Sequence, residues 1–222
     1  MIDLPRLPTL EVEPHPLLDL WALVAELPAP LAEVSSPPAL VEALGRDAPA
    51  PLAPSDEIRQ RIRALLKVGG FKPTGRSKPA SEYLLGAAAD GPLRSINPAV
   101  DAGNAVSLHS GLPISVVDLD RVRPPLRVAI AARGSSYVFN PSGQVIDVGG
   151  LVCLHDADGP CANAVKDAQR SKTDGATRRT LSLLWSSAEL PGRGEKAAAW
   201  YRELLAALGA EVATAPVRAP GD

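Results

Sequence analysis

The sequence is poor in aromatic residues and in cysteine, and both shortages narrow the kinds of protein it can encode. Trp, Tyr and Phe make up 4% of the 222 residues, so the core must be built largely from Ala, Val and Leu. The two cysteines, Cys153 and Cys161, allow at most one disulfide. A chain of this length does not need such a bridge, and we expect two reduced thiols.

Long hydrophobic runs are also absent. No stretch approaches the roughly 20 apolar residues that cross a bilayer. The start, MIDLPRLPTL, lacks the basic region followed by an apolar run that marks a targeting segment. Apolar residues make up 45% and charged residues 22%, which is typical of a soluble globular protein. We therefore expect a cytoplasmic protein with no membrane partner.

Charge and proline divide the chain into two parts. Residues 1–57 hold ten acids and two bases, a net charge of −8, whereas residues 58–222 hold fifteen acids and twenty-one bases, a net charge of +6. Eleven of the 23 prolines fall in the first 54 residues and interrupt long regular elements there. We expect residues 1–57 to form an acidic extension with short elements, in which residues 17–27 are a buried strand or a short helix. Residues 58–222 form the functional domain.

The second part begins with a run of positive charge. Ser55 is a cap for a helix that begins near Asp56 and stops at Gly69-Gly70. Residues 58–81 contain seven bases and no acid, which gives a local field suited to phosphates. A solvated helix face beside a loop is an equally good interpretation of the same run.

A second helix carries a polar group near a glycine. Asn97 followed by Pro98 is a helix start, because the Asn side chain caps free N–H groups and Pro loses no hydrogen bond at the first position. The helix should run to about residue 110. Asp101 and Asn104 share one face of it, and Gly103 beside them should let another backbone approach closely. This pattern indicates a site.

The remaining segments predict an α+β fold. Short β-type runs cover residues 114–118, 126–132, 135–139, 144–148 and 151–155, and we expect an antiparallel meander. A later strand at residues 181–185 precedes an amphipathic helix that Gly209 ends. Helices are grouped around strands instead of alternating with them, so the class is α+β, an antiparallel or mixed sheet with packed helices.

Two apparent motifs, a phosphate-binding loop and a zinc site, lack residues that these sites require. Residues 70–77 superficially match a phosphate-binding loop, but Arg76 replaces the lysine and a helix precedes the loop where a strand is required. Cys153, His155 and Cys161 supply three potential metal ligands where a structural zinc site needs four. We expect no metal and no cofactor.

A set of motifs resembles a known family. SINPAVDAGNAVSL at residues 95–108, followed by GLP at 111–113 and DLD at 118–120, is similar to the editing domain of the phenylalanyl-tRNA synthetase β subunit, the module called B-three/B-four. KPASEYL at 78–84, NAVKD at 163–167 and QRSKT at 169–173 are similar to segments of free-standing proteins that contain this domain alone. The likeness covers about residues 58–214. The chain has no segment that resembles the parts with which the synthetase charges tRNA.

The resemblance implies an α+β fold whose pocket receives the 3′ end of an aminoacyl-tRNA and hydrolyses a wrongly attached amino acid in trans. Such a second sieve is needed because one pocket separates near-isosteric side chains by only ~10–200-fold. The catalytic residues that the resemblance implies are Asn104, Ser115 and Asp101. The substrate-binding residues are Lys78, Ser81, Lys166, Asp167, Arg170, Lys172 and Thr173.

One departure from the family pattern opens an alternative. Ser115 stands where the synthetase pattern has histidine, and a serine hydroxyl at its ordinary pKa cannot act as a base near neutrality. Either a water held by Asn104 and the backbone performs the hydrolysis, or the domain is a binding module for a tRNA end or an amino acid that has lost catalysis. The slightly negative total charge favours the second interpretation.

Overall fold

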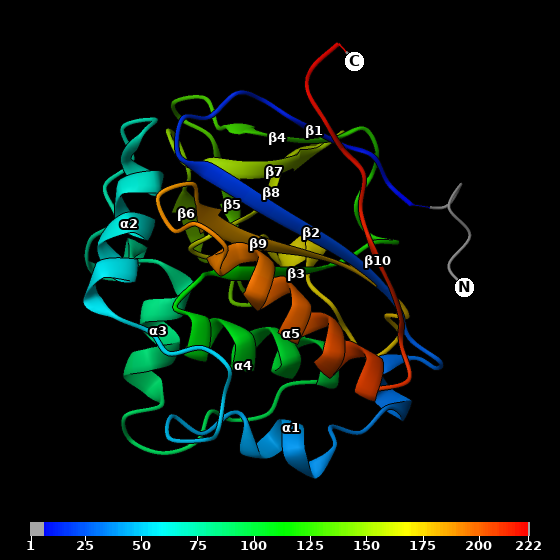
Figure 1. Ribbon diagram of the computed structural model, residues 1–222. Helices are drawn as coiled ribbons and strands as arrows, with labels where there is room; N and C mark the ends of the chain where they lie inside the picture. Colours follow the sequence, from blue (N-terminus) through cyan, green and yellow to red (C-terminus); the bar gives the residue numbers. More distant parts are fainter. Residues whose placement is uncertain (1–6, 222) are drawn as a thin grey trace.

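The computed structural model describes residues 7–221 and arranges them in three layers. Figure 1 shows two β-sheets stacked above a layer of helices, with strand β2 running diagonally across the middle. One apolar cluster fills the space between the two sheets, and a second fills the space between the inner sheet and the helices. The expected α+β class is confirmed. The first six residues, on which part of the targeting prediction rests, lie outside the described range.

The inner sheet has four strands in the order β10, β2, β9 and β3. These strands are Glu211–Thr214, Leu18–Glu26, Arg179–Ser187 and Ile114–Asp118. The period-2 pattern of β9 assigns its two faces: Leu183 and Trp185 belong to the cluster between the sheets, whereas Leu184 belongs to the cluster under the helices. The strands predicted at residues 114–118 and 181–185 are confirmed.

The N-terminal part contributes to this sheet. Residues 17–27, for which strand and helix were both open, form β2, which pairs with β9 over nine residues and with β10 on its other side. Ala22 and Val24 on β2 contact the cluster between the sheets. The Pro-rich extension expected for residues 1–57 therefore supplies a strand to the sheet formed by residues 58–222.

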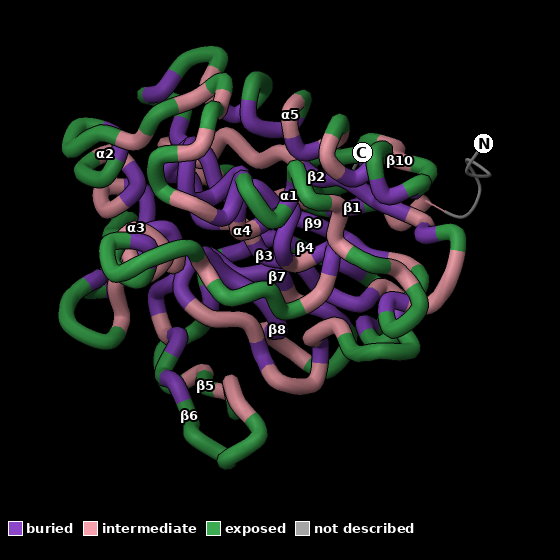
Figure 2. Tube along the Cα trace, turned by 90° about the horizontal axis from the view of Figure 1, so that it is seen from below, coloured by how far each residue is buried: buried purple, intermediate pink, exposed green. Residues whose placement is uncertain are grey.

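The outer sheet has five strands in the order β11, β1, β4, β7 and β8. These strands are Val217–Arg218, Leu10–Val12, Leu126–Ile130, Val152–Asp156 and Gly159–Asn163. A separate hairpin pairs β5, Ser136–Val138, with β6, Val145–Asp147. Figure 2 shows this hairpin projecting from the body of the molecule.

The predicted antiparallel meander is wrong, although each of its five strands exists. They are divided among three sheets, with β3 in the inner sheet, β4 and β7 in the outer sheet, and β5 and β6 in the hairpin. Local alternation fixes which residues are extended, but the partner of a strand depends on distant segments. Here β1 pairs with β4 in parallel, and β9 pairs with β3, so chain order and sheet order differ.

Two of the helices begin where the capping residues Ser55 and Asn97 predict. The five helices are α1, Pro38–Glu42; α2, Asp56–Lys67; α3, Ala80–Ala87; α4, Pro98–Ser110; and α5, Arg193–Ala207. The Oγ of Ser55 accepts a hydrogen bond from the N–H of Ile58 at 3.3 Å. The Oδ1 of Asn97 accepts one from the N–H of Val100 at 3.0 Å. Both caps satisfy N–H groups that a helix start leaves free.

Gly103 permits a close approach by side chains and not, as predicted, by another backbone. A Cβ atom at this position would lie 2.9 Å from Cγ2 of Val116 and 3.3 Å from the hydroxyl of Tyr201. Val116 comes from β3 and Tyr201 from α5, so the glycine lets α4 pack against both. This packing fixes α4 relative to β3, the edge strand of the inner sheet.

Candidate functional site

The segment from residue 163 to residue 173 folds back beside β3 and carries most of the predicted substrate-binding residues. It turns at Asn163, whose Oδ1 accepts hydrogen bonds from the N–H groups of Val165 and Lys166 at 2.8 and 3.0 Å. A backbone bridge joins Val117 of β3 to Lys172. The short 3-10 turn η4, Gln169–Ser171, closes the segment.

Ser115 lies at the centre of a buried hydrogen-bond network. Its Oγ is 2.7 Å from Oδ1 of Asp167 and 3.1 Å from the carbonyl oxygen of Asn163. The indole N–H of Trp185 donates to the same Oγ at 3.0 Å. A hydroxyl has one proton and two lone pairs, so these contacts satisfy it. Ser115 is fully buried, and it orients Asp167.

Asp167 is a carboxyl group with a perturbed protonation equilibrium. Burial raises its pKa to about 6, against the opposing effects of hydrogen bonds from Ser115 and from the N–H of Asn163 and of the positive charge of Lys172. The N–H of Asn163 donates to Oδ1 of Asp167 at 3.1 Å. The N–H of Val116 is a third donor to this carboxylate, so one of its roughly four acceptor positions remains open. Such a group accepts a proton near neutral pH.

Cations and aromatic rings gather beside this network. The Nζ of Lys166 lies 4.2 Å from the centre of the Phe139 ring and 5.8 Å from that of Tyr83. The Nζ of Lys78 lies 4.6 Å from the Tyr83 ring. These are cation–π distances, which hold the ammonium groups over the ring faces. Both lysines are partly exposed.

A cavity of about 460 Å³ opens at this cluster. Its lining includes Arg76, Ser77, Phe139, Lys166 and the strand β6. Because Phe139 and β6 belong to the hairpin, and Arg76 belongs to the short 3-10 turn η3, Gly75–Ser77, the cavity lies between two surface elements. We call it the Lys166 cavity.

The side chain of Lys172 is bound to the backbone of Phe139. Its Nζ donates a hydrogen bond to the carbonyl oxygen of Phe139 at 2.5 Å. Burial lowers its pKa, the charge of Asp167 opposes this shift, and the neighbouring Lys166 adds to it. The tethered ammonium thus fixes the hairpin to the segment 163–173 and places positive charge near Asp167.

Arg170 is held by an ion pair inside the protein. Its guanidinium donates to both oxygens of Asp156 at 2.6 and 2.7 Å and to the carbonyl oxygen of Gly159 at 3.1 Å. Burial alone would raise the pKa of Asp156, but the hydrogen bonds from Arg170 and from two backbone N–H groups lower it below its usual 3.8. These contacts satisfy Arg170 in a fork geometry and tie the segment to the outer sheet.

Asp101 and Thr173 lie at a different place, a groove of about 660 Å³ at the amino end of α4. Asp101 is fully buried behind this groove and accepts hydrogen bonds from the hydroxyls of Ser36 and Ser95 and from the N–H of Ile96, at 2.6–2.8 Å. Thr173 accepts one from the Nδ2 of Asn97 at 3.1 Å. We call this region the α4 groove.

Asn104 and Ser81 complete the predicted set. Asn104 is partly exposed on α4, and its side chain has no hydrogen-bond partner within residues 7–221. Ser81 is buried on α3, whose first N–H, from Ala80, donates to the carbonyl oxygen of Ala164 at 2.8 Å. This bond fixes α3 against the segment 163–173, which brings Lys78 near Lys166.

The aromatic part of the site was not predicted from the sequence. Tyr83, Phe139 and Tyr137 surround Lys166, and the hydroxyl of Tyr137 donates to the carbonyl oxygen of Lys166 at 2.5 Å. The signal was present in the composition, because a chain with only eight aromatic residues places three of them here. Their positions on α3 and β5, and just after β5, give no local pattern that joins them.

The remaining predictions concern cysteines, metals and membranes. Cys153 and Cys161 are free, as expected, and burial raises the pKa of Cys153 to about 12. Within the described chain, no group of three or more His, Cys, Asp or Glu residues is arranged to hold a metal ion. Among residues 7–221, no helix has the length and apolar character to span a bilayer.

Comparisons with known proteins agree with this architecture. The family model of the B3/4 domain matches residues 71–183, about half of the chain. The β subunit of phenylalanine–tRNA ligase from Bartonella henselae is 31% identical over 106 residues, which cover 46% of this chain and 13% of that subunit. The crystal structure of an N-terminal fragment of the phenylalanyl-tRNA synthetase β subunit from Pyrococcus horikoshii matches with a TM-score of 0.53 and 9% identity.

That structural match covers 96% of this chain and 52% of the fragment, so the two share a fold. The chain thus corresponds to a small part of the Bartonella subunit and to about half of the Pyrococcus fragment. The resemblance carried by the motifs at residues 95–120 is confirmed: this chain belongs to the B3/4 domain family.

Proposed function

We propose that this protein hydrolyses the ester bond of a mischarged aminoacyl-tRNA and that the reaction takes place at the Lys166 cavity. The observation that carries the proposal is the juxtaposition of Lys166, held over two aromatic rings, with the Ser115–Asp167 pair on the adjacent residue. The relatives described above are subunits of an enzyme that acts on tRNA. A tRNA substrate implies a cytoplasmic location.

Two cations that line the cavity, Arg76 and Lys166, and the neighbouring Lys78 bind the terminal nucleotide in this proposal. Arg76, Lys78 and Lys166 form no ion pair within residues 7–221, so their positive charge is available to phosphate and carbonyl oxygens. Tyr83 and Phe139 hold the lysines in place, which reduces the entropy lost when the substrate binds. Asn104 remains in the predicted role of orienting the attacking water or a ribose hydroxyl.

Asp167 accepts the proton of that water. The water oxygen attacks the ester carbonyl carbon, its proton passes to Asp167, and the bond from that carbon to the ribose oxygen breaks. The same proton then passes to the leaving ribose oxygen, so the carboxylate is regenerated. An aminoacyl ester is already activated, so positioning and oxyanion stabilisation by a nearby ammonium supply much of the rate.

The remaining predicted residues take supporting roles in the proposal. Ser115 positions Asp167 through the hydrogen bond at 2.7 Å. Arg170 and Asp101 hold the segment 163–173 and the start of α4 through their hydrogen bonds to other parts of the protein. We also propose that residues 58–222 carry the editing site, with β2 as structural support from the N-terminal part.

A deacylation assay tests the proposal. Purified protein is incubated with a panel of tRNAs, each esterified with a radiolabelled non-cognate amino acid, and the loss of label is compared with buffer. We expect at least one substrate to lose its amino acid faster, and Lys166→Ala to slow that loss.

A titration with the same charged tRNAs separates catalysis from binding alone. Salt-sensitive binding together with an unchanged ester half-life for every member of the panel would contradict the hydrolase. The protein would then be the binding module that the satisfied hydroxyl of Ser115 also permits.

A further inference from the structure

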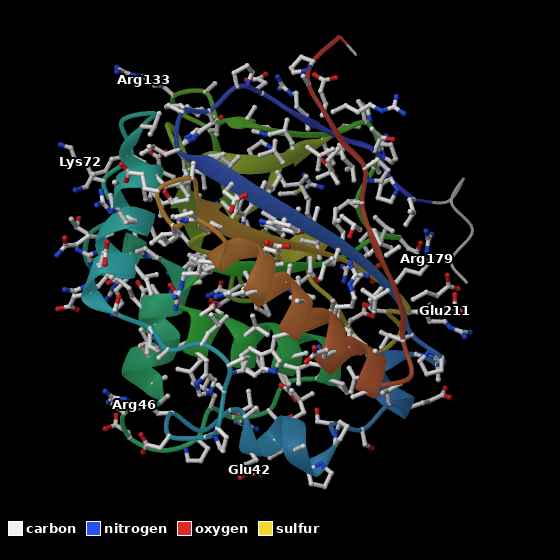
Figure 3. The ribbon with its side chains drawn as sticks, viewed as in Figure 1. Glu42, Arg46, Lys72, Arg133, Arg179 and Glu211 are labelled. Carbon is white, nitrogen blue, oxygen red and sulfur yellow. The ribbon has the colours of Figure 1, made fainter. Side chains whose placement is uncertain are left out.

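A strip of unpaired positive charge leads away from the Lys166 cavity. It consists of Lys67, Lys72, Arg76 and Arg133, and we call it the basic strip. All four side chains are exposed, and none of them forms an ion pair within the described part of the chain. Figure 3 shows Lys72 and Arg133 pointing outward on the same side of the molecule.

Glycine contacts bring these residues together from three segments. Gly69, just after α2, lies so close to Gly150 that a Cβ atom would be 2.3 Å from the carbonyl oxygen of Gly150. Gly149 approaches Arg133 in the same way, with 3.2 Å between a Cβ atom and the Cα of Arg133. The end of α2, the turn after β6 and the loop before β5 therefore meet.

The segment 71–77 connects this meeting point to the cavity. A Cβ atom on Gly150 would lie 3.2 Å from the N atom of Phe71, and five residues later Arg76 lines the Lys166 cavity. Lys72 thus lies at one end of the segment and Arg76 at the other. The positive charge continues from the cavity to Arg133 along one face.

The strip differs from the other bases of the same run. Arg59, Arg61 and Arg63 on α2 form ion pairs with Asp56, Glu189 and Glu82, so their charges are balanced. One acid, Asp147, lines the Lys166 cavity together with Arg76, and its Oδ1 accepts a hydrogen bond from the N–H of Gly149. The charge run at residues 58–81 is therefore divided into a balanced helix face and an unbalanced strip.

We infer that the basic strip binds the phosphates of the RNA strand that leads to the esterified nucleotide, and that this contact makes polynucleotide substrates bind more tightly than a single aminoacyl nucleoside. The inference rests on the proposed function. A row of exposed cations without counter-charges attracts a polyanion and releases its counterions, whichever bases the strand carries.

Binding of an uncharged minihelix RNA ending in CCA, measured by fluorescence anisotropy between 50 and 200 mM salt, tests the strip. Each lost phosphate contact lowers the slope of log K against log salt by about 0.7–0.9. The triple variant Lys67→Ala, Lys72→Ala, Arg133→Ala, which leaves Arg76 in the cavity, should reduce the slope by about 2–3. The matched control is Lys196→Ala, an exposed cation on α5, which should leave the slope unchanged.

A second variant tests the sign of the effect. Asp147→Asn removes the adjoining negative charge but keeps an oxygen that can accept from Gly149, and it should tighten minihelix binding by a few-fold at 50 mM salt. An unchanged slope in the triple variant, or binding of the wild type that does not depend on salt, would overturn the inference.

Hydrolysis of an aminoacyl-adenosine separates this inference from the proposed function. If the strip binds RNA, the triple variant should raise KM for the minihelix at least tenfold and change KM for the aminoacyl-adenosine less than twofold. An equal rise in KM for both substrates in the triple variant would contradict RNA binding by the strip and would leave the proposed hydrolase activity unaffected. If the wild type hydrolyses neither substrate, the proposed hydrolase activity is wrong. The salt dependence of minihelix binding would then still test whether the strip binds RNA.

Discussion

The Lys166 cavity and the α4 groove lie at opposite ends of the segment 163–173, and both are lined by residues of the family motifs. They differ in how far their polar groups are satisfied. Behind the α4 groove, Asp101 accepts three hydrogen bonds from the protein itself. At the cavity, the ammonium of Lys166 lies over aromatic rings and forms no ion pair within the described residues. Beside it, Asp167 accepts hydrogen bonds from Ser115 and from two backbone N–H groups, and burial raises its pKa to about 6.

This difference shows which motif residues build the site and which react in it. A charged group that the fold satisfies on every side contributes rigidity, because any ligand must compete with its internal partners. A charged group that is held in place but not satisfied gains a partner when a substrate arrives. By this criterion, Arg170 and Asp101 belong with the scaffold, and Lys166 belongs with the chemistry. Asp167 joins Lys166 because burial raises its pKa to about 6, which lets it accept a proton near neutral pH.

The largest loss in the free energy of unfolding is expected for a substitution at Arg170. Arg170→Ala leaves the carboxylate of Asp156, whose side chain is 0% exposed, without its partner. Loss of one partner of a buried pair costs about 3 kcal/mol, and urea unfolding measures it. Because the pKa of Asp156 lies below 3.8, the full loss is expected above pH 4 and disappears as the pH falls below that value.

The matched control for this variant is an exposed ion pair. Arg123→Ala removes the pair with Asp158, whose side chains are 70% and 44% exposed, and should cost less than ~1 kcal/mol. Equal losses for the two variants would contradict the distinction between satisfied scaffold and open site.

Asp101→Ala should reduce the free energy of unfolding by about 2–3 kcal/mol, because two hydroxyls and one N–H lose their acceptor. Deacylation per folded molecule should fall less than about threefold. A loss near 100-fold with intact folding would instead return Asp101 to the catalytic group that the sequence resemblance predicts.

Asp167→Asn tests the residue to which the proposal assigns the proton transfer. It should reduce deacylation on the order of 100-fold, because the amide cannot accept the proton of the water. The wild-type rate should rise with pH and level off above about pH 6, whereas the residual rate of the variant should lack this inflection. A wild-type rate independent of pH between 5 and 8 would contradict this role for Asp167.

The same variant should stabilise the fold. The pKa of Asp167 is raised from 3.8 to about 6, so the folded state binds more protons than the unfolded state in this interval and loses stability as the pH rises through it. Asparagine has no such cost and keeps an oxygen for Ser115 and Asn163. We expect roughly 1 kcal/mol higher stability at pH 7.5 by thermal or urea unfolding.

The smallest effect is expected for Lys166→Ala. The side chain is partly exposed and contacts only rings, so stability should change by less than ~1 kcal/mol. KM for the esterified tRNA should rise about tenfold, with a smaller change in kcat, because a phosphate or carbonyl contact is lost. Lys196→Ala is the control and should leave KM unchanged. A stability loss above 2 kcal/mol would assign Lys166 to the scaffold.

Much of the fold was predictable because local chemistry determines it. Ser55 and Asn97 cap helices, Gly111 and Gly209 end them, and the alternation of residues 181–185 defines a buried strand. The pairing of strands was not predictable, since β1 and β2 join sheets in which they pair with strands more than one hundred residues later in the chain.

The site was predictable as a set of residues but not as an arrangement. The resemblance to the family identifies Ser115, Lys166 and Asp167, which the structure brings together. It cannot reveal that Arg170 pairs with Asp156 or that Asp101 holds Ser36, because these contacts join segments with no shared pattern. The same reason hides Phe139, which reaches the cavity from a separate hairpin.

In the proposed function, the Lys166 cavity, and not the α4 groove, receives the aminoacylated nucleotide. Chemical-shift mapping with an adenosine that carries its amino acid through a stable 3′-amide tests it most directly. We predict perturbed resonances at Lys166, Tyr83 and Phe139 and unchanged resonances at Ser36 and Ile96. Perturbation confined to Ser36, Ile96 and their neighbours would contradict the account.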